Sequence, residues 1–277
     1  MNHRSKSRLQ QAPRTIGVLL LALIAAIPLY YILINSFKSQ TEMFVSPLGL
    51  PPVWRLENFV AAFADGTMIR GFRNSLLLTL GGLILQVIIG SLAAFGMILA
   101  KIRLTTIIGT FLLFAFAVPV QVLLIPQFRM LGAIGLTDSL LGVVLLYATG
   151  AIFCYFLIVG YMRSLPRDMI EAARIDGASS LRIYWQIILP LCRPILTTVI
   201  VFQTLAIWND FLIPQVYLLS PENRTVVLQV FSAVGMHTVN WPVFFATTVI
   251  ALLPIVIFFI ICQKWIVSGL LAGSVKG

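Results

Sequence analysis

Long runs of apolar residues, separated by short polar segments, dominate the pattern of this chain. Six runs are long enough to predict membrane-spanning helices, because the core of a bilayer needs about 20 apolar residues per helix. They cover residues 16–34, 75–99, 104–125, 140–161, 195–219 and 243–262. The fifth run is interrupted by Asp210 and Pro214. The pattern therefore predicts an all-α integral membrane protein with six transmembrane helices.

The composition agrees with this class and excludes several others. Of the 277 residues, 60% are hydrophobic and 10% are charged, whereas soluble domains carry about 25% charged residues. The net charge is +10, but the basic residues lie at the edges of the apolar runs, where membrane topology accounts for them. We therefore expect no nucleic acid as a partner. The cysteines lack metal-ligand spacing and no P-loop motif occurs, so we expect no metal or cofactor on this chain.

The distribution of Lys and Arg predicts the orientation. Thirteen of these residues lie in the two termini, in the connection between the second and third runs and in the segment 163–194, and six lie in the other connections. The positive-inside rule then places both termini and the segment 163–194 in the cytoplasm. The expected organisation is a cytoplasmic tail at 1–15, an uncleaved first helix at 16–35, an extracytoplasmic loop at 36–72, a core of five helices at 73–262 and a cytoplasmic tail at 263–277.

The segment 163–194 is the longest charge-rich interval, with five Arg and three acidic residues. Pro166 is compatible with the first turn of a helix, and Gly177 is the residue type that ends one. A second helix is expected at 180–189, stopped by Pro190. By patterning alone this hairpin is either a docking element for a partner or an amphipathic hairpin at the membrane surface.

The sequence of this segment resembles the EAA signature of the permeases of ATP-binding-cassette (ABC) importers. The resemblance rests on the string Glu171-Ala172-Ala173-x-x-Asp176-Gly177-Ala178, followed by Ile188-x-Pro190 and Pro194. Other strings are similar to the second permease subunit of the carbohydrate-uptake (maltose-type) importers: Asn74-Ser75-Leu76, Trp208-Asn209-Asp210-Phe211-Leu212 and the ending Gly269-Leu270-x-Ala272-Gly273-x-Val275-Lys276-Gly277. Ser274 stands where that ending usually has Ala.

This resemblance implies a type I ABC importer permease fold in the plasma (inner) membrane of a prokaryote. It implies a sugar substrate, an oligosaccharide or a related polyol or glycoside, delivered by an extracytoplasmic sugar-binding protein. The other implied partners are membrane lipid, a second homologous permease subunit and an ATPase homodimer, which would hold the ATP and Mg. The residues implied to couple to the ATPase are Glu171, Ala172, Ala173, Asp176, Gly177, Ala178 and Pro190. Lys276 and Gly277 are implied to reach between the ATPase subunits.

One acidic residue, Asp210, lies inside an expected span. A charge at the centre of a membrane costs about 2.5–3.5 kcal/mol on insertion scales, so Asp210 should face protein or a water-filled path. Gln203 lies two turns earlier on the same helical face, and Asn209 is adjacent. These three residues are candidates for the translocation path. The alternative is a structural hydrogen bond to a neighbouring helix or to the partner permease, and Gln86 in the second run raises the same question.

Three other functions compete with a sugar permease. The same loop also occurs in permeases of ABC importers for non-sugar solutes, which usually lack the ending at Lys276 and Gly277. An ion-coupled secondary carrier needs no coupling loop. An intramembrane protease needs Ser and His, paired Asp or a zinc site within the spans, whereas Asp210 stands alone there. We therefore expect a transport subunit and not an enzyme.

Overall fold

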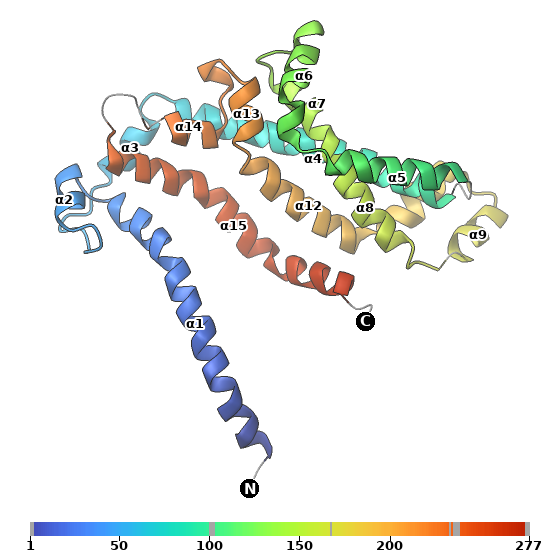
Figure 1. Ribbon diagram of the computed structural model, residues 1–277, viewed down its shortest axis with the longest axis horizontal. Coiled ribbons are helices and arrows are strands. Elements are labelled where there is room, and N and C mark those ends of the chain that lie inside the picture. Colours follow the sequence, from blue (N-terminus) through green and yellow to red (C-terminus); the bar gives the residue numbers. More distant parts are fainter. Residues whose placement is uncertain (1–2, 100–102, 167, 233, 235–238, 275–277) are drawn as a thin grey trace. The chain divides into compact units, whose positions relative to one another are not determined.

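A computed structural model describes residues 3–99, 103–166, 168–232, 234 and 239–274. Every regular element in these ranges is a helix (Figure 1), which confirms the all-α prediction. Helices suit a membrane because they satisfy their backbone hydrogen bonds internally. The chain forms two compact units. Unit 1 comprises Met1–Met68 and Val230–Leu253, and unit 2 comprises Ile69–Gln229 and Pro254–Gly277.

Unit 1 contains α1 (His3–Asn35), α2 (Gln40–Val45), α3 (Glu57–Phe63) and the first half of α15 (Trp241–Ser274). In α1 the apolar stretch Thr15–Asn35 is exposed along most of its length, with Ile34 and Asn35 buried at its end, so most of its surface is suited to contact with lipid. A capping box starts α2, because Ser39 Oγ accepts the Glu42 amide and Glu42 Oε2 accepts the Ser39 amide. Near the end of α1, Tyr31 packs edge-on against Phe245 at the start of α15, with 5.5 Å between ring centroids.

An ion pair closes the loop between α2 and α3. Arg55 Nη2 lies 3.1 Å from Glu42 Oε1. This hydrogen bond, together with the Ser39 amide, lowers the pKa of Glu42 to about 2. Asn58 donates to the carbonyl oxygens of Ser36 and Lys38, which ties α3 back to the end of α1. The segment 36–72, expected as a loop, therefore contains the short helix α3, which these contacts anchor.

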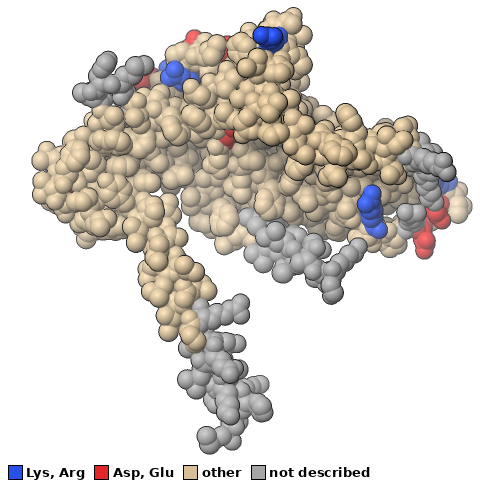
Figure 2. All heavy atoms as spheres, in the orientation of Figure 1, with Lys and Arg blue, Asp and Glu red and all other residues tan. Residues whose placement is uncertain are grey.

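Most of the chain's helices belong to unit 2. They are α4 (Thr67–Leu99), α5 (Arg103–Ala117), α6 (Val120–Ala133), α7 (Leu140–Tyr147), the 3-10 turn η1 (Ala148–Gly150), α8 (Ala151–Met162), α9 (Asp168–Ile175), α10 (Ser180–Ile183), the π-helix η2 (Tyr184–Ile188), α11 (Leu189–Leu191), α12 (Arg193–Trp208), α13 (Leu212–Tyr217), η3 (Pro221–Asn223) and α14 (Val226–Ser232). Within this unit α9 lies at the end where α4 finishes and α5 begins (Figure 1). Acidic and basic side chains gather at this end (Figure 2).

The six predicted spans correspond to four single helices and two bent pairs within the described residues. Thr15–Asn35, Thr67–Leu99, Leu140–Met162 and Trp241–Lys264 are each long and apolar enough to cross a membrane. The third span, expected as one helix at 104–125, is bent by 96° between α5 and α6. A break at this point follows from Pro119, which precedes α6 in an extended conformation and donates no backbone hydrogen bond.

The fifth span also differs from its prediction. The helix expected at 195–219 ends at Trp208, and α13 starts after a break that contains Asp210. The membrane-length pair in this region instead joins Ser180–Leu191 to Arg193–Trp208 with a bend of 76°. The Asp210 carboxylate explains the break, because it accepts the first two backbone amides of α13. A short polar side chain that bonds to the backbone in this way competes with a continuous helix.

Two buried clusters hold unit 2 together. One joins α4, α8, the loop helices and α12 around Phe95, Cys154, Ile158, Tyr184 and Val199. In this cluster α4 approaches α8 at Gly90, where a Cβ atom would lie 2.6 Å from the Cβ of Cys154. The other cluster joins α4, α6, α7, α12 and α13. The first cluster includes residues of the loop at 163–194, and the second includes residues that line a pocket described below.

Asp138 fixes the connection between α6 and α7 to the segment after α13. Its side chain accepts the backbone amides of Leu219 and Ser220, the Ser220 hydroxyl and the Asn223 amide. Burial by itself raises the pKa of Asp138, but these hydrogen bonds outweigh it and hold the pKa below its usual value. The backbone of Asp138 has a φ of 51°, a conformation that Asp and Asn tolerate better than most residues.

Candidate functional site

The first candidate site is the loop at 163–194, which begins with α9. Gly177 has a φ of +79°, in the left-handed region that favours glycine. The Gly177 amide donates to Arg174 O and the Ala178 amide donates to Ala173 O, both at 3.0 Å. These two bonds form a Schellman motif, which terminates a helix by satisfying its last carbonyl groups. The prediction that Gly177 ends the first loop helix is confirmed.

The second part of the loop differs from the predicted helix at 180–189. Ser179 caps α10 by accepting the Arg182 amide, and the backbone then widens into the π-helix η2. Pro190 does not stop the helix, and that prediction is wrong. In η2 the Leu189 amide donates to Tyr184 O, five residues back, and Pro190 lies in the short α11 that follows. The chain turns instead at Cys192, between α11 and α12.

The inner face of the loop is attached to the transmembrane core. The Tyr184 hydroxyl lies 2.7 Å from Ser91 Oγ on α4, and its ring lies 5.4 Å from that of Phe95. Ile183, Ile188 and Tyr184 belong to the buried cluster that also contains α8 and α12 residues. A displacement of the loop therefore acts directly on α4 through packed side chains and one hydrogen bond.

The outer face of the loop is exposed and mixed in character. Ile175 is 86% exposed, and Leu181 and Trp185 are further exposed apolar residues of this charge-rich loop. Of the expected coupling residues, Ala173 is buried, Ala178 is half-buried and the others are exposed: Glu171, Ala172, Asp176, Gly177 and Pro190. Exposed apolar side chains of this size, surrounded by charges, suit a protein interface better than plain solvent. Lys276 and Gly277, the expected tail contacts, lie outside the described residues.

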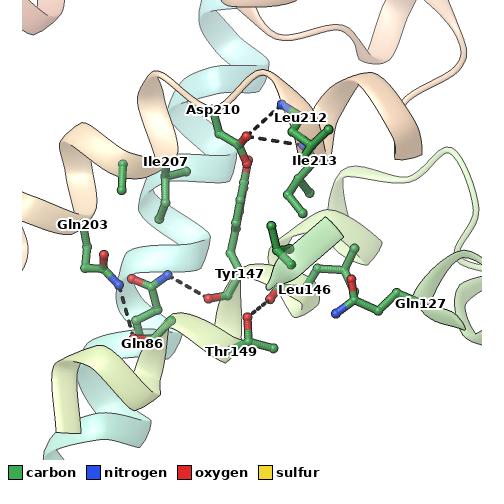
Figure 3. Close-up of a pocket in the computed structure, with 13 residues that line it drawn as sticks. Gln86, Gln127, Leu146, Tyr147, Thr149, Gln203, Ile207, Asp210, Leu212 and Ile213 are labelled. Carbon is green, nitrogen blue, oxygen red and sulfur yellow. Dashed lines mark hydrogen bonds between the residues drawn. The ribbon is translucent and has the colours of Figure 1, made fainter. Parts of the chain in front are cut away.

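The second candidate site is a polar pocket of about 250 Å³ inside unit 2 (Figure 3). Its walls come from α4, α6, α7, η1, α12 and α13. The lining residues are Gln86, Val120, Gln127, Leu146, Tyr147, Thr149, Gly150, Gln203, Ala206, Ile207, Asp210, Leu212 and Ile213. Segments far apart in the sequence therefore present four amide or carboxylate side chains to one cavity.

Asp210 joins two walls of this pocket. Its Oδ2 accepts the Tyr147 hydroxyl at 2.9 Å, and its Oδ1 accepts the backbone amides of Leu212 at 2.9 Å and Ile213 at 3.3 Å. These donors compensate for the cost of placing a carboxylate at membrane depth. Figure 3 shows the Tyr147 ring standing between its own helix and the carboxylate.

Two glutamines close the opposite wall. Gln86 Nε2 donates to Tyr147 O at 2.7 Å, and Gln203 Nε2 donates to Gly150 O at 3.2 Å. Gly150 makes this arrangement possible, since a Cβ there would lie 2.7 Å from Gln203 Nε2 and still closer to Gln86. On the α6 side, Gln127 Oε1 accepts the Tyr217 hydroxyl at 3.1 Å.

The structure brings together only part of the predicted path. Gln203 and Asp210 line the pocket, as does Gln86. Asn209 is not among the lining residues, and its amide donates to Leu205 O at the end of α12. Sequence reasoning missed Tyr147, Thr149 and Gln127, because a tyrosine, a threonine or a glutamine near an apolar run gives no signal of its own. Among the residues described, no group of three His, Cys, Asp or Glu side chains is placed to hold a metal ion.

The chain is all-helical, with helices of membrane length and a helical loop at 163–194. Comparison with protein families identifies the class of protein to which this fold belongs. Residues 86–271 match the family described as "Binding-protein-dependent transport system inner membrane component". The match covers more than half of the chain, so the chain belongs to this family. It is a multi-pass ABC transporter permease subunit, a transport component and not an enzyme.

Several relatives that match nearly the whole chain are named as permeases for sugars. It is 35% identical over 260 residues to a probable starch degradation products transport system permease of Thermoanaerobacterium thermosulfurigenes, covering 93% of this chain and 94% of the relative. It is 30% identical to the arabinooligosaccharides transport system permease of Bacillus subtilis, over the full length of both chains. It is also 30% identical to the diacetylchitobiose uptake system permease of Streptomyces coelicolor, over 94% of this chain and 87% of the relative.

Solved structures support the fold. A chain of a bacterial ABC transporter involved in the import of the acidic polysaccharide alginate matches with a TM-score of 0.83. The two chains are 23% identical, and the match covers 95% of this chain and 98% of the other. A chain of the alginate transporter in complex with a pentasaccharide-bound periplasmic protein matches with a TM-score of 0.66 at 15% identity. The predicted ABC importer permease fold is therefore confirmed.

Proposed function

We propose that this chain is one of two permease subunits of an ABC importer that moves a sugar, an oligosaccharide or a related polyol or glycoside, across the inner membrane of a prokaryote. The single observation that carries the proposal is the loop at 163–194. Its motif residues form a closed helical turn with an exposed outer face, and its inner face is packed on α4. A loop built in this way can receive force from a partner and pass it to the membrane helices.

The ATPase is the partner proposed for this loop. On the exposed face, the carboxylates of Glu171 and Asp176 would bind basic residues of the ATPase, and the exposed Ile175 would add an apolar contact. In the proposed complex, an ATPase homodimer holds the ATP and Mg, so this chain needs no cofactor. Closure of the ATPase dimer then moves α9 and α10, and η2 carries the displacement to α4. Lys276 and Gly277 are proposed to contact the ATPase dimer as well.

The orientation and the remaining partners complete the proposal. Both termini and the loop at 163–194 lie in the cytoplasm, which agrees with the excess of Lys and Arg on that side. A second, homologous permease subunit packs beside this chain, and lipid surrounds both. A binding protein outside the membrane delivers the sugar, in line with the periplasmic protein in the related alginate complex. The sugar class is supported by the starch-product, arabinooligosaccharide and diacetylchitobiose permeases.

The test is purification of the tagged chain from its native membrane, identification of its companions and reconstitution in liposomes. We expect an ATPase, a second permease and a binding protein to copurify. Liposomes with internal ATPase and ATP should then take up radiolabelled maltotriose, raffinose or N,N′-diacetylchitobiose. Uptake driven by an ion gradient without ATP would contradict the proposal and favour a secondary carrier. ATP-driven uptake of a non-sugar solute alone would retain the importer and reject the sugar class.

A charge-reversal pair tests the coupling loop. Glu171→Arg should remove most of the ATPase from the purified complex, because the charge that would meet basic ATPase residues is inverted. Glu222→Arg is the matched control, since Glu222 is an exposed acid in η3, on the side predicted to be extracytoplasmic. We expect the control to retain its ATPase. Equal ATPase retention in the two variants would contradict docking through Glu171.

A further inference from the structure

Three helix interruptions meet at the polar pocket. The 3-10 turn η1 contributes Thr149 and Gly150, the α5–α6 bend contributes Val120, and the α12–α13 break contributes Asp210. Irregular backbone at membrane depth is tolerated only where it is buried in protein or lines a water-filled cavity. Gln86, another lining residue, lies close to the middle of the 33-residue helix α4. The interruptions therefore surround a cavity well inside the bilayer.

One wall of the cavity holds an unpartnered polar atom. Gln86 is 3% exposed, and its Oε1 has no hydrogen-bond partner. Its Nε2 is already committed to Tyr147 O at 2.7 Å, so a flip of the amide would break that bond. A buried acceptor without a donor is costly in free energy, which makes a donor from the pocket favourable. This oxygen has no partner within the protein, and the side chain that carries it borders the pocket.

The Asp210 carboxylate is a second acceptor in the lining of the pocket. The Asp210 carboxylate accepts three hydrogen bonds from the protein, whereas a carboxylate has about four lone-pair positions. The apolar side of the pocket is formed by Val120, Ile207 and Ile213. A neutral molecule with several hydroxyl groups and an apolar face matches this lining, whereas an anion would meet the Asp210 carboxylate. The volume of about 250 Å³ equals about eight waters at 30 Å³ each, which suits a single sugar ring.

We propose that this pocket is a subsite for one sugar unit, in which Gln86 Oε1 and the Asp210 carboxylate accept hydroxyl groups. The inference rests on the proposed sugar-import function and adds that this chain itself contacts the substrate. Tyr147 positions the Asp210 carboxylate, and Gln203 with Gly150 positions the wall that carries Gln86. Thr149 and Gln127 border the same space. A pocket occupied by ordered water alone is the alternative that the experiment must separate.

The test uses the assembled complex, purified in detergent, with Ala206 replaced by cysteine. Ala206 is exposed and lines the pocket, so a small substitution there leaves the walls intact. The native Cys154, Cys192 and Cys262 are buried, and labelling of the wild-type complex gives their background. A water-soluble, charged methanethiosulfonate reagent should label Ala206→Cys. Maltotriose, raffinose or N,N′-diacetylchitobiose at about 50 mM should slow this labelling about fivefold, as expected for a site with a Kd of about 10 mM.

A second substitution in the Ala206→Cys background identifies the contact. Gln86→Leu should abolish the protection by sugar, while the labelling rate without sugar stays within twofold. Thr79→Val is the matched control on the same helix, because Thr79 Oγ1 is also buried and unpartnered but does not line the pocket. Protection should persist in this control. Betaine at the same concentration, which has no hydroxyl group, should not protect.

The possible results either support or overturn the proposed sugar subsite. No labelling of Ala206→Cys by the charged reagent would overturn it, because the pocket is then closed to water in the complex. Labelling without protection by any of the three sugars would overturn it in favour of ordered water. Protection that survives Gln86→Leu would reject the assigned contact. If Gln86→Leu fails to assemble, Ala206→Phe, which fills the pocket from an exposed position, must lower sugar uptake at least tenfold relative to Ala206→Ser.

The inference and the proposed function fail separately. ATP-driven uptake without protection at Ala206→Cys leaves the importer in place and removes the subsite. Protection without ATP-driven uptake leaves a sugar site in this chain and removes the importer.

Discussion

The loop at 163–194 and the polar pocket both belong to unit 2, yet they are built in opposite ways. The loop is polar on its surface and is formed by residues that are neighbours in the sequence, such as Arg174, Gly177 and Ala178. The pocket has four amide or carboxylate side chains in a mostly apolar lining and is formed by residues from six separate elements. In the proposals above, the loop binds a partner protein through exposed side chains, whereas the pocket binds a ligand through hydrogen-bond acceptors that lack a partner within the protein. A short motif can therefore specify an exposed docking element, while an internal binding site depends on assembly of the whole unit.

Two glycines, one in the loop and one in the pocket wall, are required for different physical reasons. Gly177 is required by its backbone, since its φ is +79° and an added Cβ would have no neighbour within 4 Å. Gly150 is required by space, because its φ is −62° as a helix residue would have it, but its Cβ would collide with the amides of Gln86 and Gln203. The same substitution to alanine therefore tests two different physical causes.

The largest effect is expected from Gly150→Ala. The clash displaces the amides of Gln86 and Gln203 and disrupts their hydrogen bonds to Tyr147 O and Gly150 O, and overpacking of this kind costs about 1–3 kcal/mol of stability. We expect a lower unfolding temperature of the purified complex and loss of sugar protection at Ala206→Cys. Gly160→Ala is the control, because Gly160 lies in the last turn of α8 and a Cβ there would have no atom within 4 Å. An unchanged unfolding temperature in Gly150→Ala would mean that the pocket wall can relax.

Gly177→Ala should have a smaller effect on stability and a selective effect on coupling. A left-handed conformation costs an L-residue about 1–2 kcal/mol, and this corresponds to a population change of about 5- to 30-fold. ATP-driven uptake should fall within that range, whereas sugar protection at Ala206→Cys should stay at the wild-type level. Loss of protection in this variant would show that the loop and the pocket are coupled, which would contradict their separate roles.

Tyr184→Phe tests the connection between the loop and α4. The hydroxyl lost is the one 2.7 Å from Ser91 Oγ, and a hydrogen bond of this type contributes about 1 kcal/mol. We expect the ratio of sugar transported to ATP hydrolysed to fall about fivefold, since 1.4 kcal/mol is a factor of ten. Ser91→Ala should give the same decrease, and the double variant should not lower the ratio further. Additive effects of the two changes would argue against a direct connection.

The smallest effect at neutral pH concerns Asp138, whose hydrogen bonds are filled by the protein itself, in contrast to Gln86 in the pocket. Because its pKa in the folded protein is lowered, its contribution to stability is present above the unfolded value of about 3.9. That contribution is lost as the pH falls through the folded pKa. Unfolding temperatures measured from pH 7 to 3 should therefore drop below about pH 4. The drop should be shallower in Asp138→Asn, and identical profiles would contradict the assignment.

Much of the fold is local and could be predicted from the sequence. Apolar runs of membrane length predict helices, because a bilayer leaves the backbone few alternatives. The end of α9 could be predicted as well, since a Schellman motif involves only neighbouring residues. The breaks in the third and fifth spans had signals in Pro119 and Asp210, but their effect depended on the surroundings. Pro190 shows the limit, because the preceding π-helix lets the chain continue past a residue that usually stops a helix.

The sequence by itself determined the membrane class, the loop at 163–194 and its resemblance to ABC importer permeases, because each is a pattern of residues close along the chain. Only the tertiary structure decided which polar residues meet inside the membrane. It placed Tyr147 against Asp210 and Gln86 against Tyr147 O, and it turned Asn209 to the end of α12. These partners lie up to 63 positions apart, and hydrophobic periodicity carries no information about contacts at that separation. Gln86 Oε1 is left without a partner while Nε2 of the same amide is held by Tyr147 O on another helix.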